Sequence, residues 1–189
     1  KKGKFFVTRL HKRYLDANLP KHEIIKINEG SLKKNFWISK KIIEKVENHL
    51  QKKDQVLFFV NRRGFSPFVL CKNCLKPHSC PNCSINLVYH KRKGKLICHY
   101  CGFKSSLSRT CDKNKKCEYI FSGPGVEKVY EEVKNIFNGN KIEIFSSDTM
   151  NKKSSSETLE KIKNNKISIL VGTQLISKGF HFPNLNCIV

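Results

Sequence analysis

Three closely spaced cysteine pairs constrain this chain more than any other feature. The pairs are Cys71/Cys74, Cys80/Cys83 and Cys98/Cys101, all with C-x-x-C spacing. Two intervening residues let the chain turn back so that both sulfurs can bind one zinc ion. Disulfide-rich secreted domains lack the long helix and strand patterns that this chain has. The repeated pairs therefore favour thiolate metal ligands over disulfides.

The inner two pairs predict a complete zinc site. The segment between them, with Gly94 near its middle, has the pattern of a β-hairpin. A zinc ribbon carries one knuckle at the base of each hairpin arm, and four thiolates complete a tetrahedral structural site. The predicted ligands are Cys80, Cys83, Cys98 and Cys101.

The outer pair needs partners from the segment "CDKNKKC", which contains Cys111 and Cys117. Cys111 is well placed, but Asn114 stands where C-x-x-C spacing would put the next thiol. Cys117 either completes a second site with a larger loop or is a strand residue. The predicted outer ligands are Cys71, Cys74, Cys111 and Cys117. The remaining candidates are interpreted as ordinary polar or core side chains: His78, His90, His99 and Cys187.

Helix and strand patterns alternate outside the cysteine block and predict an α/β fold with a parallel sheet. Helices are predicted at 39–53, 126–139 and 155–165, and strands at 22–28, 55–61, 118–122, 141–149, 166–174 and 186–189. Ser39 is the predicted N-cap of the first helix, Ser155 or Ser156 that of the third, and Gly139 the C-terminal cap of the second. Ligands of such sheets bind beyond the carboxyl ends of the strands. The predicted strand ends are 61–64, 122–125, 146–149 and 172–179.

The charge of the chain favours a polyanionic partner. The formal net charge is +22, which suits nucleic acid or an acidic membrane surface. Only six of the 37 basic residues are arginine, and the chain is rich in Asn and Ile, so a coding bias towards A and T also explains the lysines. No apolar run of about 18 residues predicts a membrane span, and no signal peptide is recognisable. The chain starts without Met and stops within a predicted strand, so we expect a piece of a longer protein.

Four stretches in matching order resemble the primosomal protein N′ (PriA) family of replication restart helicases. They are "LPKHEIIKI" (19–27), "VLFFVNRRGFSPFVLCKNC" (56–74), "GPGVEKVYEEV" (123–133) and "ILVGTQLISKGFHFPNL" (169–185), of which the last resembles helicase motif V. The resemblance implies the second RecA-like lobe of a helicase, interrupted by a β-rich zinc-ribbon-like insertion. It divides the chain into a linker with the end of the first lobe (1–30), the start of the second lobe (31–70), the zinc insertion (71–117) and the truncated remainder of that lobe (118–189).

The resemblance also implies a function. Proteins of this family unwind DNA from 3′ to 5′ with ATP and Mg²⁺ in the bacterial cytoplasm, at the nucleoid. They bind forks, D-loops and single strands, and they cooperate with primosome proteins, single-strand DNA-binding protein and the replicative helicase. Two zinc ions are expected, with the inner and outer knuckles forming separate sites. Asn114 replaces the family's eighth cysteine, and Val126 replaces the usual Thr of a G-x-G-T-E stretch that Gly123, Gly125 and Glu127 still match.

The chain lacks G-x-x-x-x-G-K-[ST], the loop that holds ATP phosphates. It also lacks Walker B carboxylates and an arginine motif, so we expect an ATPase in the full protein and no catalytic residue in this piece. The loop after the last buried strand is predicted to couple the ATP cleft to DNA through Gly172, Thr173, Gln174, Lys178 and Gly179. The predicted DNA-binding residues are Arg62, Arg63, Thr173 and Lys178.

Plainer interpretations remain for several residues. The loop could be a simple strand-to-helix turn, the two arginines a solvated strand edge, and Asp148 with Thr149 an Asx turn. Phe65, Tyr100 and Phe103 are expected to pack under the knuckles rather than to stack on bases. The alternative functions are a zinc-ribbon nucleic-acid-binding module without enzymatic activity and a protein-docking module.

Overall fold

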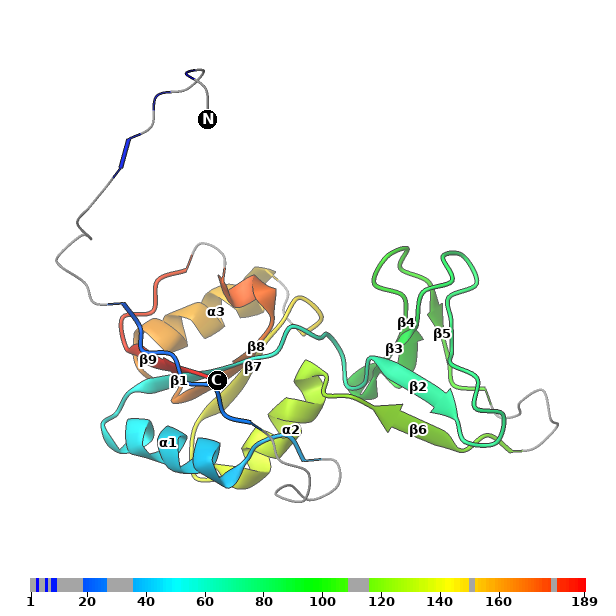
Figure 1. The fold of residues 1–189 in the computed structure, drawn as a ribbon, viewed down its shortest axis with the longest axis horizontal. Coiled ribbons are helices and arrows are strands. Elements are labelled where there is room, and N and C mark those ends of the chain that lie inside the picture. The colour runs from blue at the N-terminus through cyan, green and yellow to red at the C-terminus, as the bar shows by residue number, and fades with distance from the viewer. Residues whose placement is uncertain are drawn as a thin grey trace.

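The structure is a computed structural model that describes residues 3, 6, 8, 9, 19–26, 36–108, 116–149, 152–177 and 180–189. Figure 1 shows a layered α/β lobe and a smaller β-rich part joined to it by two loops. The lobe holds a four-stranded parallel sheet of order β7-β8-β1-β9. Its strands are β1 (Gln55–Phe59), β7 (Ile142–Phe145), β8 (Ile169–Gly172) and β9 (Leu185–Ile188).

Helices cover both faces of the parallel sheet (Figure 1). The helices α1 (Lys40–Gln51) and α2 (Val126–Ile136) lie on one face, and α3 (Lys152–Lys163) lies on the other. On the α1–α2 side, Val46 and Val133 pack against Val56 of the sheet. On the α3 side, Ile162 packs against Leu170. Residues of β1 and β8 alternate between these two cores, which explains the continuous apolar runs expected of strands buried on both sides.

The predicted α/β class and the parallel sheet are confirmed. The segment predicted as a strand at 22–28 forms no strand over its described residues 22–26. It has no pairing partner there, and Glu23 instead forms ion pairs with Lys41 and Lys45 of α1.

The predicted helix caps differ from the structure. Ser39 occupies the N-cap position of α1, but its hydroxyl makes no capping bond and is buried without a partner. Ser155 and Ser156 lie inside α3, because that helix begins at Lys152. Gly139 follows the C-cap Phe137 by two residues, so it does not end α2.

The cysteine block forms two small antiparallel sheets. One pairs β2 (Phe68–Cys71) with β6 (Tyr119–Ser122), the strands that enter and leave the block. The other contains β3 (Val88–His90), β4 (Lys95–Ile97) and β5 (Lys104–Ser105). The hairpin predicted around Gly94 is confirmed, and this glycine has the positive φ of 60° that its turn requires. We call residues 68–108 and 116–122 the ribbon.

A tight loop holds the ribbon against the N-terminus of α2. The carbonyl groups of Arg62, Gly64 and Phe65 accept hydrogen bonds from the first backbone N–H groups of α2 and from Gly125. The N–H of Phe65 donates to Tyr89 of β3 at 2.8 Å. A Cβ atom on Gly125 would lie 2.3 Å from the carbonyl oxygen of Gly64, so only glycine fits there.

Within the part of the chain that the structure describes, none of the helices has the length and apolar character needed to cross a bilayer.

Candidate metal centre and nucleic-acid interface

Four thiols converge at the base of the ribbon hairpin. The Sγ–Sγ distances are 3.7 Å for Cys80–Cys83, 3.5 Å for Cys80–Cys101 and 3.8 Å for Cys83–Cys98. All four sulfurs lie within 4.8 Å of one another. Tetrahedral zinc with bonds of about 2.3 Å separates its sulfur ligands by about 3.8 Å. The four thiols of the predicted inner site therefore fit zinc closely.

All three cysteine pairs share one backbone geometry. In each pair the carbonyl of the first cysteine accepts a hydrogen bond from the residue after the second cysteine. These residues are Leu75, Ser84 and Gly102, and each has a positive φ, between 55° and 78°. The outer pair thus has the same knuckle turn as the two pairs of the inner site.

Backbone donors favour the thiolate form in two knuckles. A hydrogen bond from the backbone of Phe103, with smaller contributions from neighbouring thiols, lowers the pKa of Cys101 to about 6. A backbone hydrogen bond from Cys74 outweighs burial and lowers the pKa of Cys71 to about 7. The pKa of Cys83 is raised, first by its hydrogen bond to Cys101 and then by burial. Zinc binds the thiolate form of cysteine, so the lowered pKa values of Cys101 and Cys71 favour metal binding at these two residues.

One cysteine of the outer pair lies close to Cys117. The Sγ atom of Cys117 lies 4.0 Å from that of Cys71, because the pairing of β2 with β6 places Cys71 opposite Tyr119. Cys111 and Asn114 lie outside the described residues. Of the four predicted outer ligands the structure describes Cys71, Cys74 and Cys117, and their role as ligands remains a prediction.

A second polar cluster lies between the ribbon and the lobe. The Nε2 atoms of His90 and His99 are 2.9 Å apart, and Nδ1 of His90 lies 3.1 Å from Oε1 of Glu127. Nδ1 of His99 lies 4.0 Å from Oδ1 of Asp148. Burial opposes ionisation of Glu127, but the hydrogen bonds from His90 and from the backbone of Arg92 and Lys91 outweigh it and lower the pKa of Glu127.

Desolvation lowers the pKa of His99 in the same cluster, although the charge of Asp148 raises it. The sequence interpretation of His90 and His99 as ordinary polar side chains did not foresee that they would meet.

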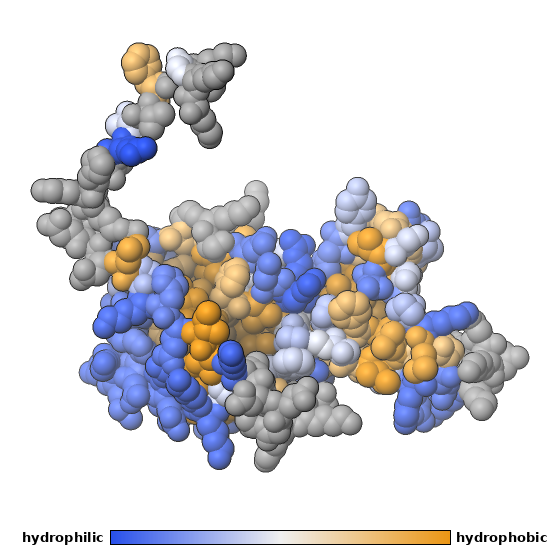
Figure 2. All heavy atoms as spheres, viewed as in Figure 1, coloured by the Kyte–Doolittle hydropathy of each residue, from blue (hydrophilic) through white to orange (hydrophobic). Residues whose placement is uncertain are grey.

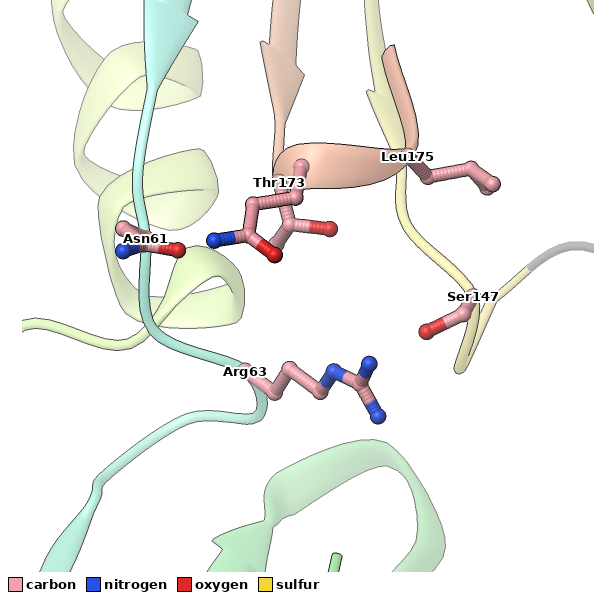
Figure 3. A pocket seen from close by; sticks show the side chains of 6 residues that line it. Asn61, Arg63, Ser147, Thr173 and Leu175 are labelled. Atoms are coloured by element: carbon pink, nitrogen blue, oxygen red, sulfur yellow. The ribbon is translucent and has the colours of Figure 1, made fainter. Parts of the chain in front are cut away.

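A hollow of about 220 Å³ lies beyond the carboxyl ends of β1, β7 and β8. It is lined by Asn61, Arg63, Ser147, Thr173, Gln174 and Leu175. Figure 3 shows the guanidinium group of Arg63 extending towards the space between Thr173 and Ser147. Hydroxyl, amide and guanidinium groups at one site suit phosphate oxygens. We call this hollow the carboxyl-end pocket.

Several predicted site residues meet at this pocket, and others do not. Arg63, Thr173 and Gln174 line it, whereas Gly172 is buried in β8, where a Cβ atom would lie 3.1 Å from the carbonyl oxygen of Phe145. Arg62 is exposed, and its carbonyl binds α2. Lys178 and Gly179 lie outside the described residues. Asn61 and Ser147 were not singled out from the sequence, although each lies in a predicted strand-end segment.

The three candidate aromatic residues have different surroundings. Phe103 packs against the ribbon core, and Phe65 contacts the rings of Tyr89 and Phe121, as expected. The packing predicted for Tyr100 is wrong, because this side chain is 83% exposed. It lies between the two cysteines of the third knuckle, where the short turn leaves no surface for it to pack on.

The described ribbon also has exposed apolar side chains. Phe68 on β2 and Ile120 on β6 are 46% and 41% exposed, and Leu75 in the outer knuckle is 69% exposed. Figure 2 shows hydrophobic residues gathered over the β2–β6 sheet.

Comparison with known protein families matches residues 80–105 to the Cys-rich region domain of PriA DNA helicase. The match covers the inner knuckles and the hairpin between them. A protein of Rickettsia felis named replication restart protein PriA is 41% identical over 188 residues, which are 98% of this chain. The chain matches a segment of PriA.

Proteins of the same name from Haemophilus influenzae and Bacillus subtilis are 33% and 31% identical, over 98% and 99% of the chain. The resemblance to PriA found in the sequence motifs is thus confirmed. The chain spans 29% of the length of the Rickettsia protein and about a quarter of the other two.

Val126, where the PriA-like stretch departs from the family pattern, is 1% exposed and packs in the core beneath α2. Glu127, which keeps the pattern, binds the ribbon through His90 and the backbone of Lys91.

Proposed function

We propose that this chain is the second RecA-like lobe, with its zinc-binding insertion, of a bacterial ATP-dependent 3′ to 5′ DNA helicase that restarts stalled replication forks. The observation that carries the proposal is the similarity to PriA over nearly the whole chain. The parallel sheet with helices on both faces agrees with such a lobe. ATP and Mg²⁺ would be held with parts of the protein outside this chain, because no phosphate-binding P-loop sequence is present in it.

The carboxyl-end pocket is the proposed contact with the DNA backbone. Arg63 supplies a cation at its edge, and Thr173, a residue that is 5% exposed, supplies a hydroxyl group. The loop that follows, with Gln174, Lys178 and Gly179, would couple this contact to the ATP cleft. The excess of positive charge on the chain supports binding of forks, D-loops and single strands at the nucleoid. Primosome proteins, single-strand DNA-binding protein and the replicative helicase are the proposed protein partners.

The test compares Arg63→Ala with the full-length wild-type protein in binding to forked DNA across a range of salt concentrations. Removal of one phosphate contact should weaken binding and lower the salt slope by about one. Lys134→Ala, which removes an exposed cation in the last turn of α2, is the matched control. Equal slopes for Arg63→Ala and wild type would contradict the proposed contact. Loss of ATP-dependent unwinding with binding retained would place Arg63 in coupling instead.

A protein-docking role for the ribbon is a second candidate. It rests on the exposed apolar side chains of Phe68, Ile120 and Leu75. Phe68→Ser with Ile120→Ser should then abolish primosome assembly without changing DNA affinity. Normal assembly by this double variant would exclude the β2–β6 sheet as the docking surface.

A further inference from the structure

Four ionisable side chains meet where the ribbon contacts the lobe. His90, at the end of β3, and His99, in the third knuckle, belong to the ribbon. Glu127 in the first turn of α2 and Asp148 in the turn after β7 belong to the lobe. The side chain of His90 is fully buried, and those of Glu127, Asp148 and His99 are 5%, 15% and 20% exposed. Water therefore screens the charges of this cluster poorly.

The two histidine rings face each other through their Nε2 atoms, which are 2.9 Å apart. Each of these nitrogens has one lone pair or one N–H group in the plane of its ring, so a single proton or a single metal ion fits between them. The carboxylates of Glu127 and Asp148 lie on the far sides of this pair, next to Nδ1 of His90 and Nδ1 of His99.

Asp148 has a buried carboxylate oxygen without a hydrogen bond. Its Oδ2 atom is buried, and no hydrogen-bond donor reaches it among the described residues. Its Oδ1 atom lies 4.0 Å from Nδ1 of His99, too far for a hydrogen bond. Arg63 and Lys93 lie close enough to influence His99 electrostatically, but Oδ2 remains without a donor. A buried carboxylate oxygen without a donor is costly, so the position calls for a cation.

We propose that His90, His99 and Asp148 bind a divalent transition-metal ion with zinc-like chemistry, separate from the cysteine sites. One ring nitrogen of each histidine and one oxygen of Asp148 lie within 4.8 Å of one another. Imidazole and carboxylate are ligands of zinc and of related divalent ions. The metal takes the place of the shared proton, so both Nε2 lone pairs become ligands and the charge of the two carboxylates is neutralised.

Glu127 has the position expected of a group that orients a metal-binding histidine. Such a histidine donates its other ring N–H to a carboxylate, which fixes the ring and its tautomer. Nδ1 of His90 lies 3.1 Å from Oε1 of Glu127, and Oε2 of the same carboxylate accepts from the N–H of Lys91. His90 is therefore held with Nε2 directed at His99.

The proposed ion would cross-link two parts of the molecule. Bonds of about 2.0–2.1 Å in a tetrahedron place ligand atoms about 3.3 Å apart, so binding draws Asp148 towards the histidines. Asp148 follows Ser147, which lines the carboxyl-end pocket. The ion would thus fix the ribbon on the lobe beside the proposed DNA contact.

The experiment measures zinc per chain in the full-length protein after equilibration with buffered zinc. It compares wild type with Asp148→Asn and His90→Gln, which keep side-chain size. Both variants should hold one zinc fewer than wild type. Asp54→Asn, which removes another partly buried carboxylate that pairs with a histidine, should keep the wild-type content. X-ray absorption of wild type should show nitrogen or oxygen neighbours at about 2.0–2.1 Å besides sulfur at about 2.3 Å, and the neighbours at the shorter distance should disappear in Asp148→Asn.

Equal zinc content in wild type and Asp148→Asn, or sulfur neighbours alone in wild type, would overturn the proposal and leave a shared proton as the bridge. Asp148→Asn decides the outcome if His90→Gln fails to fold, because Asp148 is the more exposed of the two residues and lies in a turn. Retention of the cysteine-bound zinc in Asp148→Asn shows that the ribbon is still folded.

Discussion

The Sγ atom of Cys117 lies 4.0 Å from that of Cys71, although the two cysteines are 46 positions apart in the chain. Pairing of β2 with β6 brings the start and the end of the ribbon together. A cysteine outside C-x-x-C spacing therefore reaches the outer knuckle. If the outer site binds zinc, Cys117 supplies the thiol that is missing at residue 114, where the chain has Asn.

Cys117→Ser tests this outer site. We expect the variant to hold about one zinc fewer per chain than wild type, because an alcohol does not replace a thiolate ligand. Native mass spectrometry of the protein without added chelator measures the loss. Cys187→Ser is the control, since burial raises the pKa of this thiol and it packs in the lobe. An unchanged zinc count in Cys117→Ser would show that the outer knuckle does not use this residue.

Gly125→Ala tests the contact between the loop 62–65 and α2. The added methyl group would meet the carbonyl oxygens of Gly64 and Phe65 at 2.3 and 2.7 Å, and both are backbone atoms. We expect the free energy of unfolding to fall by about 2–3 kcal/mol. Gly139→Ala is the matched control, because no atom lies within 4 Å of the position that its added methyl group would take, and the change should stay within about 0.5 kcal/mol. Urea denaturation measures both, and similar stabilities for the two variants would contradict the packing argument.

Local patterns predicted the lobe well because its elements depend on local sequence. The apolar spacing of Ile42, Val46 and Leu50 is sufficient to predict α1, and the run Val56–Phe58 is sufficient to predict a buried strand. The strand predicted at 22–28 is absent over residues 22–26. A strand requires a neighbouring strand to pair with, and the periodicity of a sequence carries no information about pairing.

The candidate site could be predicted where the spacing of residues along the chain determines their positions in space. C-x-x-C spacing was sufficient to predict which four thiols converge in the inner site, since both thiols of a knuckle lie on one turn. The meeting of His90 with His99 and Asp148 could not be predicted, because it depends on how the ribbon is held on the lobe. That placement in turn depends on Gly64 and Gly125, whose missing side chains permit a close backbone contact.

Asn186→Ala tests the pH dependence of the edge strand β9. Asn186 donates to Oδ1 of Asp54 at 2.8 Å, and His49 lies 2.7 Å from Oδ2. These hydrogen bonds, that of Asn186 first, lower the pKa of Asp54. The stabilisation is present above the ordinary carboxyl pKa of about 3.9 and is lost as pH falls through the lowered pKa of the folded state.

We therefore expect Asn186→Ala to be less stable than wild type by about 1 kcal/mol at pH 7 and by less below pH ~4. Urea denaturation of both proteins at a series of pH values measures this difference. Loss of zinc in acid affects both proteins and cancels in the comparison. A difference that stays constant with pH would show that Asn186 acts through packing alone.

Tyr100→Ala tests whether the ribbon contacts bases. The side chain of Tyr100 is 83% exposed, and the net positive charge of the chain favours binding of nucleic acid. Stacking of a base on an aromatic ring contributes ~1–3 kcal/mol, so the affinity for single-stranded DNA should fall about tenfold. Tyr100→Phe keeps the ring and should bind as wild type does. Fluorescence anisotropy measures the affinities, and an unchanged zinc content confirms that the knuckle is intact. Wild-type affinity in Tyr100→Ala would instead make this exposed ring a candidate for protein docking, as Leu75 in the outer knuckle is.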